Sequence, residues 1–200
     1  LVLALLLDFF VTEKAWRGGV ARSIATTHLI DRIARAHDLP LYRTPVGFKY
    51  LAELFLADKI IFGGEESACL AVKNHLPEKD GIIAGLLLVE MLAARKNNLS
   101  SLIDALFVKY GKLEGGQRSI PLTGDRERKL KQLIRKPPRK LAGRAVLKAE
   151  TMDGIKLDFD GDDWLLMRFS GTIPVIRCYG EAETQRGLDA LMRAGVELIT

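Results

Sequence analysis

A segment near the C-terminal end, RFSGTIPVIR, combines the side chains and backbone groups that bind phosphate in proteins. A glycine in a turn lets successive backbone N–H groups point toward one anion, and the hydroxyls of Ser170 and Thr172 add donors beside Gly171. Arg168 and Arg177 carry planar guanidinium forks that match phosphate oxygens. The segment therefore predicts a phosphate-binding turn between two strands. The alternative is an ordinary hairpin turn with solvated arginines, since turns that contain glycine are common.

A second polar segment, GGEES at residues 63–67, directly follows the short apolar stretch at residues 59–62. A carboxylate and a hydroxyl on a glycine-rich loop can accept from and donate to the neighbouring hydroxyl groups of a sugar. Glu65 and Ser67 are therefore candidate sugar-binding residues. The alternative is a turn after a strand, with exposed acidic side chains.

A third segment, TPVGFK at residues 44–49, is typical of the start of a helix. Thr44 can cap the helix and Pro45 suits its first turn. Lys49 would then lie near the positive end of the helix dipole, where a cation is unfavourable unless an anionic ligand lies nearby. Lys49 is thus a candidate ligand-binding residue, and the alternative is an ordinary surface lysine.

The acidic and sulfur-containing residues do not predict a metal site. Asp158, Asp160 and Asp162 alternate as in a carboxylate metal loop, but Asp160-Gly161 between two alternating segments predicts a hairpin turn whose acids are turn residues. The two cysteines, Cys69 and Cys178, and the three histidines lack the paired spacing of a zinc site. Two distant cysteines also exclude a disulfide scaffold and favour a reducing, cytoplasmic location.

Composition and hydrophobic pattern indicate the elements that must position these segments. With 200 residues, 48% of them hydrophobic, the chain is expected to form one or two globular domains and not a disordered segment. The net charge of +5 suits an anionic ligand. The longest uncharged apolar runs, residues 1–7 and 82–89, are too short to cross a bilayer. The chain opens on such a run without a methionine, so we expect it to be a fragment.

The first half of the chain alternates short apolar runs with helical periods, which predicts an α/β domain with a mixed sheet covered by helices. In such a fold the ligand loops lie at the carboxyl ends of the strands. Ser100 and Ser101 are the expected caps of the last helix. The expected strands are 18–22, 39–43 and 59–63, and the expected helices are 1–14, 27–37, 46–57, 81–96 and 101–110.

A glycine-rich stretch at residues 111–122 and a change of period after it indicate a domain boundary. We expect an α/β domain at residues 1–114 and a smaller α+β domain at 115–200, with the stretch between them acting as a hinge. The second domain is expected to contain helices at 123–135 and 184–198 and strands at 143–151, 154–160, 163–169 and 174–182.

Residues 125–148 contain ten lysines or arginines and two acids. Such a run is usually a solvated face, which is the interpretation that we favour. Binding to nucleic acid is the alternative, but no aromatic residue in the run could stack on a base.

Five sequence blocks, taken together and in order, resemble the C-terminal half of an α-D-phosphohexomutase of the phosphoglucomutase/phosphomannomutase family. The resemblance covers nearly the whole chain. It implies the third domain of that family, which is α/β, followed by the fourth, an α+β domain that resembles the TATA-binding protein. The blocks are GGVARSIATTHLID (18–31), TPVGFKYL (44–51), GGEESACL (63–70), PEKDGIIAGLLL (77–88) and RFSGTIPVIRCYGEA (168–182).

The resemblance also implies a function and roles for the matched residues. Members interconvert hexose 1-phosphate and hexose 6-phosphate by phosphoryl transfer from an enzyme phosphoserine through a hexose 1,6-bisphosphate, with Mg²⁺ as cofactor. Glu65 and Ser67 would bind the hydroxyls of the sugar, and Arg22 and Lys49 would line the same cleft, with Lys49 the one candidate for a catalytic role. The substrate phosphate would be bound by Arg168, Ser170, Gly171, Thr172 and Arg177.

Several features of the family pattern are missing from this sequence. Neither a phosphoserine loop of the type TASHNP nor a metal loop of the type DGDGDR is present. Mg²⁺ would therefore be bound by the absent N-terminal half, and we expect the chain alone to bind hexose phosphate without isomerising it. Ala68 and Cys69 replace two glycines of the family pattern, and Ile173 replaces a glutamate. The alternative functions are a non-catalytic phosphosugar-binding module and, with less support, a nucleic-acid-binding protein; a membrane partner is not expected.

Overall fold

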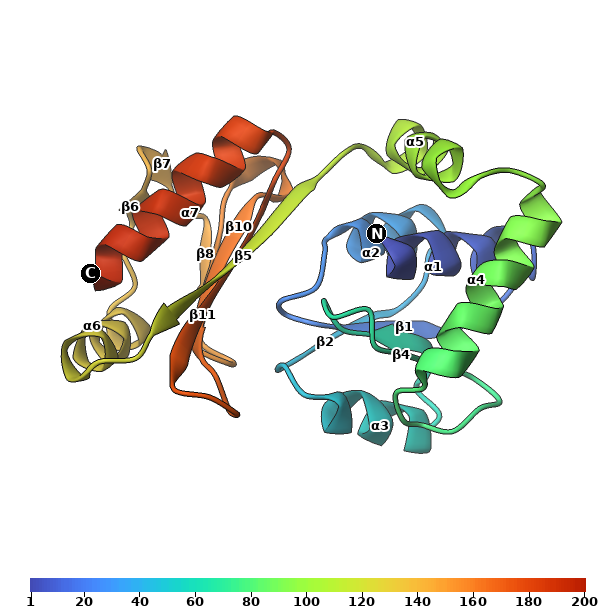
Figure 1. Ribbon diagram of the computed structural model, residues 1–200, viewed down its shortest axis with the longest axis horizontal. Helices are drawn as coiled ribbons and strands as arrows, with labels where there is room; N and C mark the ends of the chain where they lie inside the picture. The colour runs from blue at the N-terminus through green and yellow to red at the C-terminus, as the bar shows by residue number, and fades with distance from the viewer. The chain divides into compact units, whose positions relative to one another are not determined.

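The computed structural model describes all 200 residues, and the chain divides into two compact units, Leu1–Lys112 and Leu113–Thr200 (Figure 1). The division falls two residues before the domain boundary expected from the sequence. None of the helices is both long enough and apolar enough to cross a bilayer.

A four-stranded sheet with the strand order β2-β1-β3-β4 forms the centre of the first unit. β1 (Gly19–Ser23), β2 (Leu41–Thr44) and β3 (Ile60–Gly64) run parallel, and β4 (Leu70–Val72) pairs with β3 in the antiparallel direction. Every residue of β1 is buried, as expected for a central parallel strand. The mixed sheet confirms the prediction for this half of the chain, but β4 was not expected, because three residues are too few to show a period.

Five helices surround this sheet. Figure 1 shows α1 and α2 over one face and α3 over the other. Phe10 of α1 contacts Phe62 of β3 on one side, with ring centroids 6.0 Å apart, while Leu51 of α3 packs with Ala21 of β1 on the other. The helices are α1 (Val2–Thr12), α2 (Leu29–Ala36), α3 (Phe48–Leu56), α4 (Gly81–Arg95) and α5 (Leu99–Tyr110).

The prediction that Ser100 and Ser101 cap α5 was wrong. The helix begins at Leu99, and the side chain of Asn98 accepts a hydrogen bond from the backbone N–H of Ser101 at 2.9 Å. Asparagine is as good a cap as serine, so residue type alone does not decide between them.

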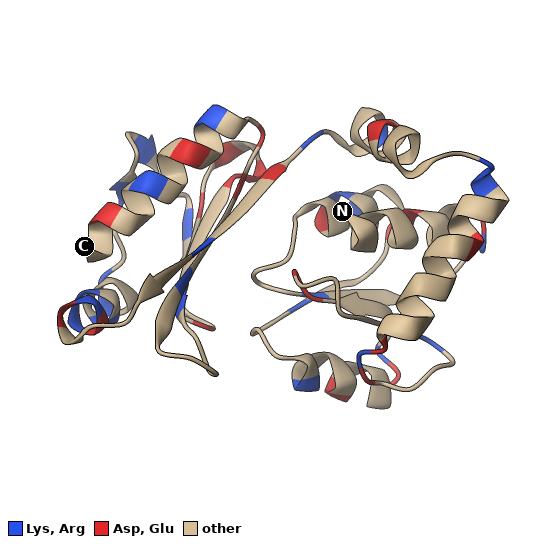
Figure 2. Ribbon diagram, in the orientation of Figure 1, with Lys and Arg blue, Asp and Glu red and all other residues tan.

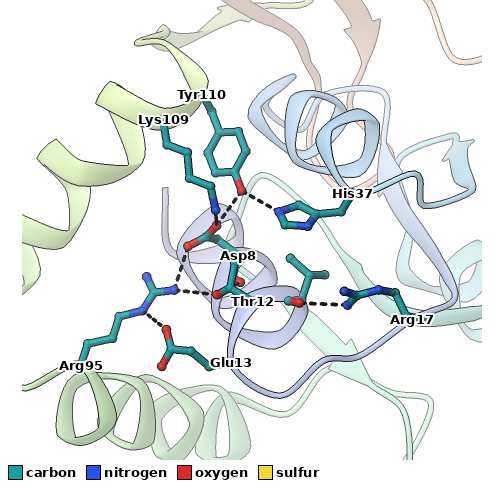
Figure 3. A network of polar contacts seen from close by, with 9 residues as sticks. Asp8, Thr12, Glu13, Arg17, His37, Arg95, Lys109 and Tyr110 are labelled. Carbon is teal, nitrogen blue, oxygen red and sulfur yellow. Dashed lines mark hydrogen bonds and ion pairs between the residues drawn. The ribbon is translucent and has the colours of Figure 1, made fainter.

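A buried carboxylate holds the helices of the first unit together (Figure 3). Asp8 lies on α1 and is 6% exposed. It accepts hydrogen bonds from Arg95 of α4 at 2.7 Å, and from Lys109 and the Tyr110 hydroxyl of α5 at 2.9 and 2.6 Å. His37, which follows α2, lies 3.0 Å from the same hydroxyl. Asp8 thus links the first helix of the unit to the last two.

The pKa values of this cluster follow from its geometry. Burial would raise the pKa of Asp8, but hydrogen bonds from Tyr110, Lys109 and Arg95 outweigh that effect and lower it. Burial and the hydrogen bond to Asp8 raise the pKa of Tyr110. Burial and the nearby Lys109 lower the pKa of His37. At neutral pH the cluster therefore contains a charged carboxylate, a neutral phenol and a neutral imidazole.

The second unit is built on a five-stranded antiparallel sheet with the order β5-β11-β10-β9-β8. Two helices belong to this unit, α6 (Gly124–Arg135) and α7 (Gln185–Ile199). The hydrophobic core contains Leu130 of α6, four residues of α7 and inward-facing sheet residues such as Met167 and Cys178. Burial raises the pKa of the Cys178 thiol to about 12, so this cysteine is a packed, unreactive side chain. The strands are β5 (Glu114–Pro121), β8 (Lys148–Glu150), β9 (Ile155–Asp158), β10 (Trp164–Phe169) and β11 (Val175–Ala182).

The stretch at residues 111–122, which is expected to act as a hinge, contains both the division between the two units and a strand. Most of it is β5, which pairs with β11 along its full eight residues. Gly116 lies beneath α7, where a Cβ would come within 3.3 Å of Leu188. Gly116 therefore allows a helix to pack closely on an edge strand.

The prediction of a single strand at residues 143–151 was also wrong. Here the chain forms a two-residue ribbon, β6 (Lys140–Leu141) with β7 (Arg144–Ala145), and then the separate edge strand β8. The antiparallel hairpin expected around Asp160-Gly161 is present, since β9 pairs with β10.

The basic run at residues 125–148 begins on α6, where Leu130 is the one buried residue (Figure 2). Two ion pairs join neighbouring turns of this helix, Arg128 with Asp125 at 2.7 Å and Lys131 with Glu127 at 2.5 Å. The helix therefore turns most of its charge toward solvent, which agrees with the favoured interpretation of a solvated face.

Candidate functional site

The first group of candidate residues lies where β1, β2 and β3 end. These strands are parallel, so their carboxyl ends meet at one edge of the sheet. Ser23 lies beside Thr44 in the strand register, and Glu65 directly follows β3. The edge therefore carries two hydroxyls and a carboxylate that are far apart in the sequence.

Glu65 joins the loop after β3 to the loop after β2. Its Oε1 accepts a hydrogen bond of 2.7 Å from the backbone N–H of Gly47, and the residue is 7% exposed. Gly47 has a φ of 138°, which a residue with a side chain rarely adopts, and α3 begins at the next residue. This hydrogen bond thus joins two segments that are separate in the sequence, TPVGFK and GGEES.

The hydroxyl groups at this edge are almost fully buried. The Oγ of Ser23 lies 2.9 Å from the Oγ1 of Thr26 and 3.5 Å from a carboxylate oxygen of Glu66. The Oγ1 of Thr44 is buried without a hydrogen-bond partner. A buried hydroxyl without a partner costs free energy, so a ligand hydroxyl or a water that bonds to Thr44 would stabilise the loop. Thr44 was expected only as a cap, yet it ends β2 and does not cap α3.

Lys49 and Ser67 are both exposed. Lys49 lies in the first turn of α3, as expected, with its Nζ 4.9 Å from the centroid of the Tyr50 ring. Ser67 lies in a tight loop closed by hydrogen bonds from the backbone N–H of Glu65 to the carbonyl of Cys69 at 2.9 Å, and from Ala68 N–H to the carbonyl of Glu65 at 3.0 Å. Both side chains can reach a ligand in solvent.

Arg22 lies elsewhere than expected. It is 1% exposed and forms a bidentate ion pair with Asp31 of α2, through Nη2 to Oδ1 at 2.8 Å and through Nε to Oδ2. Its Nη1 also donates to the carbonyl oxygen of Ser23 at 3.1 Å. Instead of lining a cleft, the guanidinium lies beneath the edge and holds the end of β1 in place. Asp31 was missed because an ion pair between a strand and the next helix has no local sequence signal.

The loop after β3 contains a strained residue. Ala68 has a φ of 64°, a left-handed conformation that costs a residue with a Cβ about 1 kcal/mol. We expect Ala68→Gly to raise the free energy of unfolding of the first unit by about 0.5 kcal/mol, because relief of strain is partly offset by the greater freedom of glycine in the unfolded chain. Chemical denaturation of the two proteins measures the difference, and a destabilised glycine variant would contradict the assigned strain.

The second group of candidate residues lies at the hairpin between β10 and β11. Arg168 and Arg177 are directly opposite each other in the register. The strand pair closes with a hydrogen bond from Ser170 N–H to the carbonyl of Val175 at 2.9 Å. The predicted turn between two strands is therefore present, with two guanidinium groups at its base.

The tip of this hairpin presents donors to solvent. Gly171 and Thr172 are exposed, and the backbone N–H of Thr172 lies 3.4 Å from the Oγ of Ser170. Each of the two arginines has a hydrogen-bond partner in the protein, which the alternative of solvated side chains does not predict. The Nε of Arg168 donates to Asp153 at 2.8 Å, and the Nη1 of Arg177 donates to the Oγ of Ser119 at 2.7 Å. Neither partner was expected from the sequence, because both come from other strands or turns.

The chain thus combines an α/β unit whose hydroxyl-rich loops follow parallel strands with an antiparallel unit that carries a paired-arginine hairpin. Residues 1–110 match the family model described as phosphoglucomutase/phosphomannomutase, alpha/beta/alpha domain III. The chain belongs to the phosphoglucomutase/phosphomannomutase family.

Individual relatives match along nearly the whole chain. A phosphoglucomutase/phosphomannomutase of Thermococcus kodakarensis is 32% identical over 196 residues, which is 98% of this chain and 41% of the relative. A crystal structure of a Thermus thermophilus protein described as a phosphomannomutase superposes with a TM-score of 0.79 and 30% identity, covering 99% of this chain and 40% of that one.

A more distant structure, N-acetylphosphoglucosamine mutase of Aspergillus fumigatus in complex with GlcNAc-6P and magnesium, shares the fold with a TM-score of 0.62 and 15% identity; the match covers 99% of this chain and 46% of that one. The chain thus spans less than half the length of the relatives it matches.

Proposed function

We propose that this chain is the sugar- and phosphate-recognising part of a phosphohexomutase that interconverts hexose 1-phosphate and hexose 6-phosphate. The observation that carries the proposal is the pair of built loops, one with buried carboxylate and hydroxyl groups and one with two opposed arginines. A sugar phosphate carries the complementary groups, neutral hydroxyls that need donors and acceptors, and an anion that needs cations. Family membership supports this assignment.

In the first unit, Glu65 and Ser67 would hydrogen-bond the sugar hydroxyls. The hydrogen bond from Gly47 N–H fixes the orientation of the Glu65 carboxylate. Lys49 would contribute a positive charge to the same ligand. Arg22 would act indirectly by fixing the end of β1, since Asp31 already neutralises its charge.

In the second unit, the phosphate would be bound by the hairpin that joins β10 and β11. Arg168 and Arg177 would supply the charge, and the Ser170, Gly171 and Thr172 turn would supply hydroxyl and backbone donors. Such a site positions a phosphate and stabilises its charge, which is most of what phosphoryl transfer requires from a protein. We also propose that this unit is the fourth domain of the family, with a fold similar to the TATA-binding protein.

The acidic residues between β9 and β10 do not fit a magnesium ion. Asp160 and Asp163 both accept hydrogen bonds from Arg144, the former at 2.8 Å, and the bond from Arg144 lowers the pKa of Asp160. An arginine in the position of the cation satisfies these carboxylates, whereas Mg²⁺ needs free oxygen ligands. We therefore propose that the Mg²⁺ and the phosphoserine of the complete enzyme belong to domains outside these 200 residues, as does the site where hexose 1,6-bisphosphate forms. A cytoplasmic location is proposed with this function.

The purified chain is expected to show no mutase turnover, because no serine in it is followed by the family's His-Asn-Pro. A coupled assay with glucose 1-phosphate, Mg²⁺ and glucose 1,6-bisphosphate measures this, using protein from a host without phosphoglucomutase. Isomerisation above the rate of the blank would contradict the proposal that essential groups lie outside the chain. Binding of glucose 6-phosphate without turnover is the expected result.

A further inference from the structure

The turn that precedes β9 is fitted closely onto the backbone of Arg168. Gly154 in this turn has a φ of 84°, and a Cβ there would lie 2.2 Å from the carbonyl oxygen of Met167 and 2.7 Å from the Cα of Arg168. The pairing of β9 with β10 ends at Ile155 opposite Met167, so the turn begins where the ladder stops. The absence of a side chain at Gly154 lets the turn reach Arg168.

This contact places Asp153 against the guanidinium of Arg168. Its Oδ2 accepts a hydrogen bond from the Nε of Arg168 at 2.8 Å, and the two side chains are 19% and 13% exposed. A half-buried carboxylate on the Nε of an arginine fixes the plane of the guanidinium, because the bond is charge-assisted and directional. The four Nη hydrogens remain available as donors.

Asp153 also offsets a local repulsion. Arg168 and Arg177 face each other across β10 and β11, and like charges in that arrangement destabilise a sheet. One carboxylate leaves a net charge of +1 on the group of Arg168, Arg177 and Asp153, which is still attractive to a phosphate. Arg177 has its own anchor in the hydroxyl of Ser119, which is uncharged.

We propose that Asp153 is the positioning residue of the phosphate site: it holds the guanidinium of Arg168 in the orientation that binds phosphate, without touching the phosphate itself. This inference rests on the proposed function of the hairpin as a phosphate site. The same contact would also serve the opposite role, in which Asp153 competes with phosphate for Arg168. The two roles predict opposite effects of removing the carboxylate.

Titration of the full chain with inorganic phosphate, followed by the Nε–H resonance of Arg168 in ¹⁵N-edited NMR spectra, distinguishes them. We expect Asp153→Ala to weaken phosphate binding about tenfold, the loss expected for one charge-assisted hydrogen bond. Asp153→Asn keeps an oxygen acceptor for the Nε–H, and we expect it to bind within about threefold of the wild type. The Nε–H signal should shift in the alanine variant and stay near its place in the asparagine variant.

Two controls separate positioning from charge and from stability. Asp189→Ala removes one negative charge from α7 in the same unit, and it should leave phosphate binding unchanged. An Arg168→Ala protein lacks the Nε–H resonance of Arg168, so its phosphate affinity is measured by calorimetry. In this background Asp153→Ala should not weaken binding further, because a positioning residue acts only through the side chain that it positions.

The outcomes separate this inference from the proposed function. Tighter binding by Asp153→Ala, unchanged binding, or an equal loss in the Arg168→Ala background would overturn the positioning role while the phosphate site stands. A wild-type chain that does not bind phosphate would overturn the phosphate site, and the role of Asp153 with it.

Discussion

Asp8→Ala is expected to destabilise the first unit by about 2–4 kcal/mol. The substitution removes the acceptor shared by Arg95, Lys109 and the Tyr110 hydroxyl and leaves the donors without their partner. The effect should fall below the upper limit for a fully buried pair, because Lys109 is 46% exposed and can be solvated. Asp8→Asn, which keeps the shape but removes the charge, should cost somewhat less.

The two tryptophans allow the units to be followed separately. Trp16 stacks on Phe10 in the first unit, and Trp164 is buried in the second. In a Trp164→Phe background, fluorescence during urea denaturation reports the first unit alone. Glu90→Gln serves as the control, since it removes an exposed ion pair with Lys14 and should change the free energy of unfolding by less than about 0.5 kcal/mol. An Asp8→Ala variant as stable as Glu90→Gln would show that the cluster around Asp8 does not stabilise the packing of α1 against α4 and α5.

The stabilisation by Asp8 should depend on pH in one direction. Its pKa in the folded chain lies below the ordinary value of 3.8, so the carboxylate contributes its full stabilisation above that value. The contribution is lost as the pH falls below 3.8 and through the lower pKa of the folded state. The stability difference between wild type and Asp8→Asn should therefore be largest at neutral pH and shrink at pH values below 3.8. A difference that grows on acidification would contradict the assigned ion pairs.

Arg168→Ala is expected to weaken binding of glucose 6-phosphate by roughly 10- to 100-fold, whereas Glu65→Ala should weaken it by about fivefold. A guanidinium bound to phosphate pairs two opposite charges and is worth roughly 1.5–3 kcal/mol, whereas Glu65 would form a single hydrogen bond to an uncharged hydroxyl, for which we expect about 1 kcal/mol. Arg168→Lys should recover only part of the loss, because an ammonium lacks the planar fork. Isothermal titration calorimetry measures the three affinities.

Arg193→Ala is the matched control for this series. Arg193 is an exposed arginine on α7, so its removal changes the net charge of the same unit by the same amount. It should leave the affinity unchanged at physiological salt, where exposed charges are screened beyond about 8 Å. Equal losses for Arg168→Ala and Arg193→Ala would show that phosphate is attracted only by the overall charge.

The elements with a clear period are those that the sequence predicts well. The spacing of Leu3, Leu6 and Phe10 indicates a buried helix, and α1 is that helix. Short or edge elements are different. β5 contains Gly115 and Gly116, which favour a loop when considered locally, and it becomes a strand because β11 offers eight residues of pairing. That partner lies far away in the sequence and cannot be seen from the local pattern.

The candidate site shows the same limit. Glycine-rich loops with Glu65 and Arg168 can be recognised from residue type, but the side chains that hold them cannot. The partners of Arg22 and Arg168 are Asp31 and Asp153, and both depend on how the elements pack. Residue type therefore identifies groups that can bind a ligand, whereas packing decides which of them are free to do so.

Calorimetric titration of the purified chain with glucose 6-phosphate tests the central claim most directly, with glucose and inorganic phosphate as separate ligands. The account predicts that glucose 6-phosphate binds more tightly than either component, that Arg168→Ala abolishes the advantage over glucose, and that Glu65→Ala reduces the advantage over phosphate. Binding of glucose 6-phosphate no tighter than that of phosphate alone, with both loop variants unchanged, would contradict it.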